Sequence, residues 1–365
     1  MRYIGVEEIE KIALGATLLG TGGGGDPTIG TLISKQAIEQ YGPVQLLSID
    51  EVDDKLLVAS PSGIGAPTVS VEKIPDIESH ERALEIIEDY LDVRVDALFP
   101  IEAGGSNSLV PFPIAAKRGI PVIDADGMGR AFPEVQMVTF YLDGLQGMPM
   151  GIADMQGNVA LINGMSAVEG EKIARSITTT FGGTASDASY VMTADKLKQS
   201  GVIGTLTLSE QIGEILLTAD KPIPALLKLL NAFLLFKGKV FDVSRKTEGG
   251  FVRGFTQLTG LDEYEDETAE MSFQNENLIF KRNEDVICMT PDLICVLDLE
   301  TGMPVTTERV KFGIRVAVIG IPCDPKWRVP KGIEVVGPRY FGYDMDYVEV
   351  ENLNKEDLHE INWER

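Results

Sequence analysis

The first 145 residues alternate between short apolar runs and amphipathic helical patterns, and this alternation leaves few folds open to the chain. Apolar side chains recur at helical spacing from Val6 to Leu19, and a second helical pattern opens at Asp26 and Pro27 and extends to Tyr41. Strands separated by helices of this length need crossover connections, so we predict a three-layer α/β domain with a mostly parallel sheet. Further helices are expected at 79–91, 107–117 and 133–142, and strands at 44–49, 56–59, 97–101 and 121–123.

The chain after residue 165 has a different pattern. Residues 166–181 and 209–236 are expected to be helical, and β-rich runs separated by turn signals follow from Lys239 onward. A spacing of about ten residues between such runs is typical of an antiparallel barrel or sandwich. We therefore predict an α/β ligand-binding domain over 1–165 and a β-rich domain with helical connections over 166–365. The predicted strands of the second domain are 239–243, 251–255, 278–280, 286–289, 293–297 and 314–319.

The net charge limits the partners of the protein. Acidic residues outnumber basic ones by 56 to 32, which gives a formal charge of −24. Such a surface repels phosphate backbones and anionic lipid headgroups, so we expect no nucleic-acid partner and no membrane partner. The N-terminus lacks a signal-peptide apolar core, which predicts a cytoplasmic location. A small-molecule substrate and a homo-oligomeric state are the remaining expectations.

Cysteine and histidine are scarce, and this argues against several kinds of catalytic site. Cys288, Cys295 and Cys323 form no CxxC pair, so we expect reduced thiols and no disulfide framework. His80 and His359 have no histidine or cysteine neighbours at ligand spacing, and no GxSxG motif supports a Ser-His-Asp triad. Catalysis is therefore expected to depend on carboxylates and backbone groups.

Loops rich in glycine and small polar residues follow three of the predicted strands, at 60–67, 102–107 and 124–130. Open α/β sheets bind ligands at the carboxyl ends of their strands, so we expect these loops to lie around one cleft roofed by the second domain. Glycines let a ligand approach the backbone, and an asparagine amide both donates and accepts hydrogen bonds. The predicted substrate-binding residues of the first two loops are Gly65, Gly104, Gly105 and Asn107.

Three carboxylates are the predicted catalytic residues. Asp124 and Asp126 point the same way if the chain is extended, and like charges held together give one protonated acid and one ionised base. Glu102 is a general base, a metal ligand or a helix cap. Arg130 either neutralises the aspartate pair or clamps a substrate carboxylate, so we include it among the substrate-binding residues. The competing interpretation of 124–130 is a solvated turn with an internal ion pair.

The sequence GTGGGGDP at 20–27 precedes a predicted helix, where free N–H groups favour an anion. It lacks the Walker lysine and Ser/Thr, and Asp26 puts a carboxylate where a phosphate would lie. Three interpretations stay open: a phosphate-binding loop, a tight helix–helix turn, and a loop that admits a neutral polar ligand. Under the third, Gly23 and Gly24 bind substrate.

Several motifs occur in an order that resembles the S-methyl thiohydantoin desulfurase-like family, and they cover nearly the whole chain. They are GTGGGGDP at 20–27, GAP at 65–67, EAGGSN at 102–107, DADGMGRAFP at 124–133, FQNEN at 273–277, TPDLI at 290–294 and GPRYFGYD at 337–344. The resemblance implies an N-terminal three-layer α/β domain and a C-terminal β-rich domain. It also implies a hydrolase that acts on a hydantoin-like or thiohydantoin-like five-membered ring and releases a thiol such as methanethiol.

That chemistry fits a carboxylate acid–base mechanism, because loss of a thiol needs an activated water and a protonated ring nitrogen or sulfur. Met128 is then expected beside the substrate, and the N–H groups of Gly104 and Gly105 would hold the ring carbonyl. The sequence requires no cofactor, and Mg²⁺ or Mn²⁺ held by the same carboxylates is an alternative. An alternative function is a non-catalytic accessory subunit of a hydantoinase- or oxoprolinase-type complex.

Overall fold

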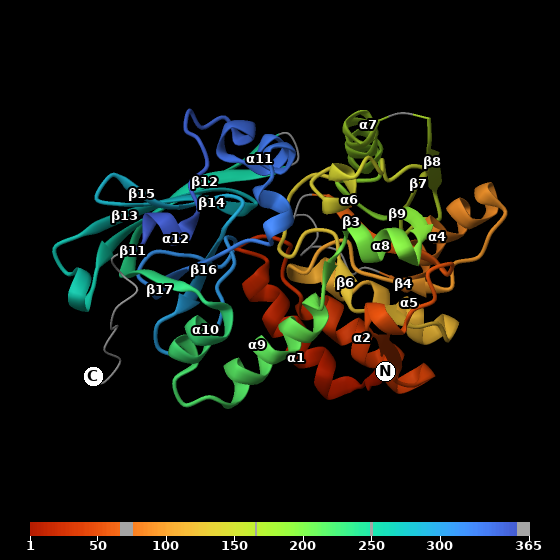
Figure 1. Ribbon diagram of the computed structural model, residues 1–365, viewed down its shortest axis with the longest axis horizontal. Helices are drawn as coiled ribbons and strands as arrows, with labels where there is room; N and C mark the ends of the chain where they lie inside the picture. Colours follow the sequence, from red (N-terminus) through yellow and green to blue (C-terminus); the bar gives the residue numbers. More distant parts are fainter. Residues whose placement is uncertain (66–75, 165, 249–250, 356–365) are drawn as a thin grey trace.

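The structure, a computed structural model, describes residues 1–65, 76–164, 166–248 and 251–355. It consists of an α/β body built on an eight-stranded mixed sheet and a β body built on a seven-stranded antiparallel sheet (Figure 1). The predicted fold class, an α/β part followed by a β-rich part, is confirmed. Among the described residues, no helix is both long enough and apolar enough to cross a membrane.

The α/β sheet has the strand order β1-β2-β5-β4-β3-β9-β7-β8. Its centre is parallel and consists of β2 (Val44–Leu47), β5 (Val122–Ile123), β4 (Ala97–Leu98) and β3 (Leu57–Gly65). Antiparallel strands extend both edges: β1 (Arg2–Ile4), β9 (Thr184–Thr193), β7 (Met150–Ala153) and β8 (Val159–Ile162). Because β9 follows residue 165, this sheet draws on both predicted domain segments.

Helices cover both faces of the α/β sheet. One face packs against α1 (Val6–Leu19), α2 (Thr28–Tyr41), α4 (Ile77–Leu91) and α5 (Pro111–Arg118). The other packs against α6 (Thr139–Leu142), α7 (Ala167–Thr180) and α8 (Ala194–Ser200). Gly151 of β7 brings α4 close, since a Cβ there would lie 2.0 Å from the Ala83 carbonyl oxygen.

The β body has the strand order β15-β14-β13-β12-β11-β17-β16, and the sheet curls so that β16 approaches β14. Its strands are β11 (Phe233–Glu248), β12 (Phe251–Gly260), β13 (Thr268–Gln274), β14 (Glu276–Arg282), β15 (Asp285–Met289), β16 (Leu293–Asp298) and β17 (Arg315–Ile321). The remaining elements are the β6–β10 pair (Ala125–Asp126 and Val202–Ile203) and the helices α9 (Thr205–Thr218), α10 (Pro222–Leu230), α11 (Pro330–Val336) and α12 (Val350–Leu353).

The strand predicted at 97–101 forms only over Ala97–Leu98, and the strands β6 to β10 were not predicted. Three further differences have a local physical reason. Residues 60–65 were expected in a loop, but they continue β3 because they pair with β9. Only Thr139–Leu142 of the helix predicted at 133–142 forms, because backbone groups of Val135 bond to Glu171 and Tyr190 instead. The helix predicted at 209–236 breaks into α9 and α10 and then enters β11, since a short apolar run does not distinguish a buried strand from a helix.

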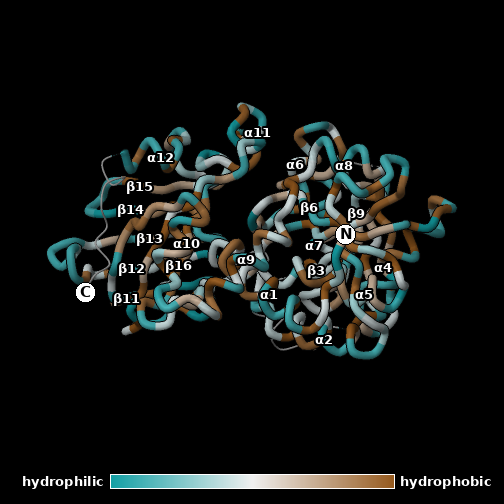
Figure 2. Tube along the Cα trace, turned by 60° about the horizontal axis from the view of Figure 1, so that its bottom comes forward, coloured by the Kyte–Doolittle hydropathy of each residue, from teal (hydrophilic) through white to brown (hydrophobic). Residues whose placement is uncertain are grey.

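The two bodies meet along α1 and α9, which lie side by side at the junction (Figures 1 and 2). Glycines bring the two helices into backbone contact. A Cβ at Gly15 would lie 1.9 Å from the Ser209 carbonyl oxygen, and a Cβ at Gly213 would lie 2.0 Å from that of Lys11. This packing fixes the glycine-rich loop that follows α1 against the β body.

Gly15→Ala is therefore expected to destabilise the protein, although alanine favours helix more than glycine does. The added methyl group meets backbone, which cannot rotate away, so we expect a loss of about 1–3 kcal/mol in unfolding free energy. Urea titration measures it. Gly30→Ala in α2 is the control, because its Cβ would meet only side chains, the Ser106 hydroxyl at 3.3 Å and Leu109 at 3.6 Å. Equal stability of the two variants would contradict the close packing of α1 on α9.

Candidate active site

A cavity of about 470 Å³ lies where the two bodies meet. The α/β body supplies most of its wall, and the β body supplies Asn275, Glu276 and Arg309. Of the predicted site residues, those that line the cavity are Gly24, Gly65, Glu102, Asn107 and Met128. Gly23, Gly104, Gly105, Asp124, Asp126 and Arg130 do not line it. The loops at 20–27 and 102–107 thus reach one cavity, whereas the loop at 124–130 contributes only Met128.

Glu102 follows β4 and faces this cavity although its side chain is only 4% exposed. Its Oε1 accepts a hydrogen bond of 2.7 Å from the Asn107 amide, and its Oε2 is buried without a hydrogen-bond partner. Burial and the nearby charge of Glu276 hold the pKa of Glu102 well above its usual value. Both effects favour the protonated form of Glu102.

Asn107 holds Glu102 in place. Besides its bond to Glu102, its Oδ1 accepts a hydrogen bond of 2.8 Å from the backbone N–H of Gly63 on β3. The amide is thus engaged at both ends and lines the cavity mainly as a support. We predicted Asn107 as a substrate-binding residue, and its contacts in this structure are those of a positioning residue for Glu102.

Glu276, the first residue of β14, is the carboxylate that faces the cavity from the β body. It is 2% exposed, and its Oε2 has no hydrogen-bond partner. Its Oε1 accepts a hydrogen bond of 3.3 Å from the backbone N–H of Gly24. Burial raises the pKa of Glu276 to about 7, against the opposing charge of Arg130.

The glycine-rich loop is a docking segment for the β body. A Cβ at Gly23 would lie 2.1 Å from the Glu276 Oε1, and a Cβ at Gly105 would lie 2.2 Å from the Gly24 carbonyl oxygen. The Thr21 and Gly22 carbonyl oxygens accept hydrogen bonds from residues of the β body. Gly23, Gly104 and Gly105 thus admit neighbouring protein groups in this structure, where we had expected a ligand.

Asp124 is at the N-terminus of α9, away from the cavity. Its Oδ1 accepts hydrogen bonds from the backbone N–H groups of Leu206 and Thr207, and its Oδ2 from the Thr207 hydroxyl. A carboxylate at this position satisfies free N–H groups and the helix dipole. The structure therefore does not bring Asp124 and Asp126 to a shared ligand site. The Asp124 carboxylate accepts hydrogen bonds from α9, whereas the Asp126 carboxylate accepts them from the turn that follows it.

Asp126 and Arg130 are buried behind the cavity wall. The Asp126 Oδ2 accepts hydrogen bonds from the Met128 and Gly129 backbones, and burial raises the pKa of Asp126 to about 7. Arg130 stacks 4.2 Å above the Phe132 ring, and its Nη1 donates to the carbonyl oxygens of Pro291 and Asp292. Arg130 thus ties the α/β body to the β body, in place of the substrate contact that we predicted.

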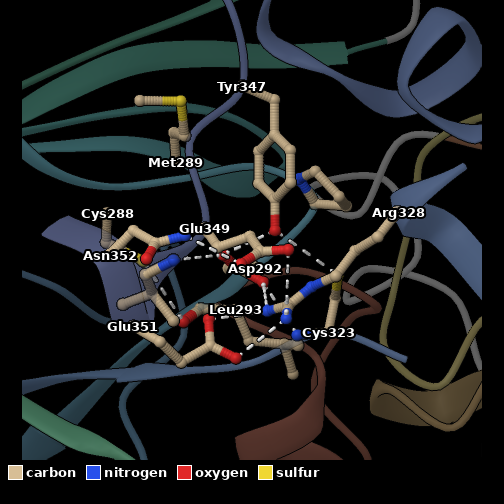
Figure 3. Close-up of polar contacts among 12 residues, drawn as sticks. Cys288, Met289, Asp292, Leu293, Cys323, Arg328, Tyr347, Glu349, Glu351 and Asn352 are labelled. Atoms are coloured by element: carbon tan, nitrogen blue, oxygen red, sulfur yellow. Dashed lines mark hydrogen bonds and ion pairs between the residues drawn. The ribbon is translucent and has the colours of Figure 1, made fainter. Parts of the chain in front are cut away.

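The fully buried Asp292 carboxylate joins several segments of the β body (Figure 3). Its Oδ1 accepts hydrogen bonds from the Cys323 backbone and the Arg328 guanidinium, at 2.8 and 2.9 Å. Its Oδ2 accepts hydrogen bonds from the Tyr347 hydroxyl and the Val350 backbone, at 2.9 and 2.8 Å. Asp292 therefore connects the start of β16 to the segments that contain these four residues. The nearby Cys288, Cys295 and Cys323 are buried free thiols.

Sequence reasoning missed most residues that line the cavity, among them Glu276, Ser62, His80 and Asp187. Glu276 lies within the FQNEN motif, so a signal was present, but the spacing of 174 residues from Glu102 hid their proximity. The sequence around His80 predicted only a polar residue near the start of a helix. Ser62 and Asp187 are cross-strand neighbours on β3 and β9, a pairing that the predicted loop at 60–67 concealed.

The structure does not gather the predicted metal ligands Glu102, Asp124 and Asp126 into one site. Within the described ranges, no group of three or more His, Cys, Asp or Glu side chains is arranged to hold a metal ion. The cavity instead presents separate carboxyl groups with different surroundings.

Comparisons with known proteins agree with this two-body fold. A model of the S-Me-THD-like N-terminal domain matches residues 7–164, and one of the S-Me-THD-like C-terminal domain matches residues 165–350. No curated protein matches the chain. An X-ray crystal structure of a protein from Chromobacterium violaceum is similar in fold, with a TM-score of 0.77 and 21% identity over 96% of this chain and 100% of that chain. Because the two domain models together span nearly all of the sequence, the chain belongs to the S-Me-THD-like family, the S-methyl thiohydantoin desulfurase-like family that its motifs resemble.

Proposed function

We propose that the protein is a hydrolase that acts on a thiohydantoin-like five-membered ring, with Glu102 and Glu276 as its acid–base pair. One observation carries the proposal: two buried carboxyl groups from different bodies face one cavity, and each has an oxygen to which no described residue donates a hydrogen bond. Burying such groups without partners costs free energy, and perturbed carboxyl groups in a cleft are typical of active sites.

The reaction replaces the S-methyl group on a ring carbon by a carbonyl oxygen from water. Glu102 protonates the adjacent ring nitrogen while Glu276 takes a proton from the attacking water. The tetrahedral intermediate then breaks its C–S bond, the proton of Glu276 passes to the sulfur, and the remaining O–H proton returns to Glu102. Methanethiol and a hydantoin ring leave, and both carboxyl groups return to their starting states.

The surroundings of the two carboxyl groups assign these roles. Burial and the Glu276 charge keep Glu102 protonated, whereas the pKa of Glu276 lies at about 7 because the charge of Arg130 opposes the effect of burial. Two carboxyl groups whose pKa values are pushed apart are suited to serve as acid and base. Met128 and Gly65 line the same cavity and are the proposed neighbours of the ring.

The rate is expected to follow a bell-shaped pH profile. kcat/KM should rise as the pH increases through about 7, where Glu276 loses its proton, and fall at higher pH, where Glu102 ionises. The two apparent pKa values belong to the coupled pair. Initial rates between pH 5 and 10 measure the profile. Glu276→Gln should remove the acidic limb, and a profile that keeps this limb in the variant would contradict the assignment of the base.

The proposal is tested with purified protein and two substrates, an S-methyl thiohydantoin and the parent thiohydantoin, with hydantoin, the expected product, as the negative control. We expect release of methanethiol from the first and of sulfide from the second, measured with a chromogenic thiol reagent, and formation of the oxygen-containing ring, measured by chromatography. Turnover that appears only when a hydantoinase- or oxoprolinase-type partner is added would instead identify an accessory subunit. The absence of turnover with both substrates under both conditions would overturn the proposed reaction.

A further inference from the structure

Three polar residues of the cavity wall have no part in the proposed acid–base pair: Ser62 on β3, His80 on α4 and Asp187 on β9. We call them the acceptor face. Ser62 and Asp187 are directly opposite in the β3–β9 ladder, and the Ser62 hydroxyl donates a hydrogen bond of 2.8 Å to the Asp187 Oδ1.

Asp187 is a buried carboxyl group that is open to a ligand on one side. It is 3% exposed, and no described residue donates a hydrogen bond to its Oδ2. Burial raises the pKa of Asp187 to about 7, while the Ser62 bond and the charge of Arg175 favour the ionised form. A buried carboxylate oxygen to which no described residue donates can accept a hydrogen bond from a ligand, because an unmet acceptor is costly in a low-dielectric wall.

His80 supplies a second unmet acceptor. Burial lowers the pKa of His80 to about 4 against the opposing charge of Asp76, and this low pKa favours the neutral imidazole. The Nδ1 atom is buried, and no described residue bonds to it. In the tautomer that carries its hydrogen on Nε2, Nδ1 offers a lone pair to a ligand.

The serine hydroxyl groups around these acceptors bond to protein groups. The Ser62 hydroxyl donates to Asp187, and the Ser79 hydroxyl lies 3.2 Å from the Asp76 carbonyl oxygen, to which it can donate. The Ser79 and Ser186 hydroxyl oxygens are 2.7 Å apart, and either of them can be the donor. The hydroxyl next to Asp187 is therefore occupied, and the other two bond to each other.

We infer that the acceptor face binds the N–H edge of an amidine-like, isothiourea-like or ureide-like group of the ligand. The Asp187 carboxylate and the His80 Nδ1 both accept hydrogen bonds and therefore favour a ligand edge that presents N–H, while the Arg175 guanidinium also lines the cavity. Placing this edge on a five-membered ring relies on the proposed function.

The acceptor face is linked to the acid–base pair through the cavity wall. Asn107 donates a hydrogen bond of 2.7 Å to Glu102 and accepts one of 2.8 Å from the backbone N–H of Gly63, the residue after Ser62. Asp187, His80 and Glu102 line the same cavity, so a ring whose N–H contacts the acceptor face shares that cavity with the proposed acid. This contact sets the orientation of the ring and makes Asp187 a specificity-determining residue.

Binding of hydantoin, which is not consumed in the proposed reaction, tests the inference by calorimetry. Wild-type protein should bind hydantoin, and at least one of N1-methylhydantoin and N3-methylhydantoin should bind about tenfold more weakly, the loss expected for one hydrogen bond to a charged group. Asp187→Asn and Ser62→Ala should each weaken hydantoin binding by a similar factor. Asp154→Asn is the control, because the Asp154 carboxylate is already occupied by Gln156 and Asn158.

The outcomes separate this inference from the proposed function. Equal binding of hydantoin and both methylated forms, or unchanged binding in Asp187→Asn together with Ser62→Ala, overturns the acceptor face even if thiohydantoin turnover is intact. The methylated ligands need only wild-type protein, so a variant that fails to fold does not remove the test. A wild-type protein that neither binds hydantoin nor releases thiol overturns the proposed function, and the inference fails with it.

Discussion

Glu276→Gln is expected to lower kcat for thiohydantoin hydrolysis by about 10²–10⁴-fold, the usual contribution of a general base. The amide keeps the shape of the side chain and its contact with Gly24 but cannot take a proton from water. Folding stability should change little, because a buried carboxyl group with an unpartnered oxygen is replaced by a neutral group. Steady-state kinetics and thermal melting measure the two effects separately.

Two further variants show whether the effect is specific. Glu102→Gln should lower kcat by a similar factor, since the proposed acid is lost. Asp124→Asn should leave kcat close to that of the wild type, because Asp124 caps α9 away from the cavity. If Asp124→Asn abolishes turnover while Glu276→Gln retains it, the acid–base pair proposed here is wrong and the aspartate loop acts instead.

Asp292→Ala is expected to produce the largest loss of stability, about 3–5 kcal/mol, the cost of leaving one partner of a buried ion pair uncompensated. The substitution removes the acceptor of four hydrogen bonds and leaves the Arg328 guanidinium with only the acidic residues around α12. Chemical denaturation monitored by fluorescence measures the change. Asp292 does not line the cavity, so activity should fall only as the folded fraction falls.

An exposed ion pair of the same type provides the control. Asp344, whose side chain is 97% exposed, contacts Arg339 at 2.7 Å. Asp344→Ala should change the unfolding free energy by less than about 1 kcal/mol, as is usual for solvent-exposed pairs. A similar, small effect of both substitutions would show that the Asp292 cluster does not hold the β body together.

Local chemistry explains what was predicted correctly. The helix at 6–19 has the predicted bounds, because apolar residues recur at helical spacing and Gly20 follows the last turn. Glu102 was predicted from its place after a strand beside Gly104, and the structure places it in the cavity wall. The order of α/β and β-rich parts also follows from periodicity alone, since strand and helix periods differ.

Contacts between distant segments decided the rest. Glu276 lies at the same cavity as Glu102 because the glycines at 22–25 let β14 approach the loop after α1. No local sequence pattern predicts this approach. Asp124 and Asp126 looked like a pair because their spacing is two, yet the α9 N-terminus takes one carboxylate and the adjacent turn takes the other. Likewise, Ser62 and Asp187 meet through strand pairing across 125 residues. The sequence alone therefore determined helices such as the one at 6–19, the order of the α/β and β-rich parts, and Glu102 as a cavity residue, because these depend on neighbours along the chain. Only the tertiary structure decided which buried charges share the cavity, because burial and pairing depend on segments that the chain brings together after folding.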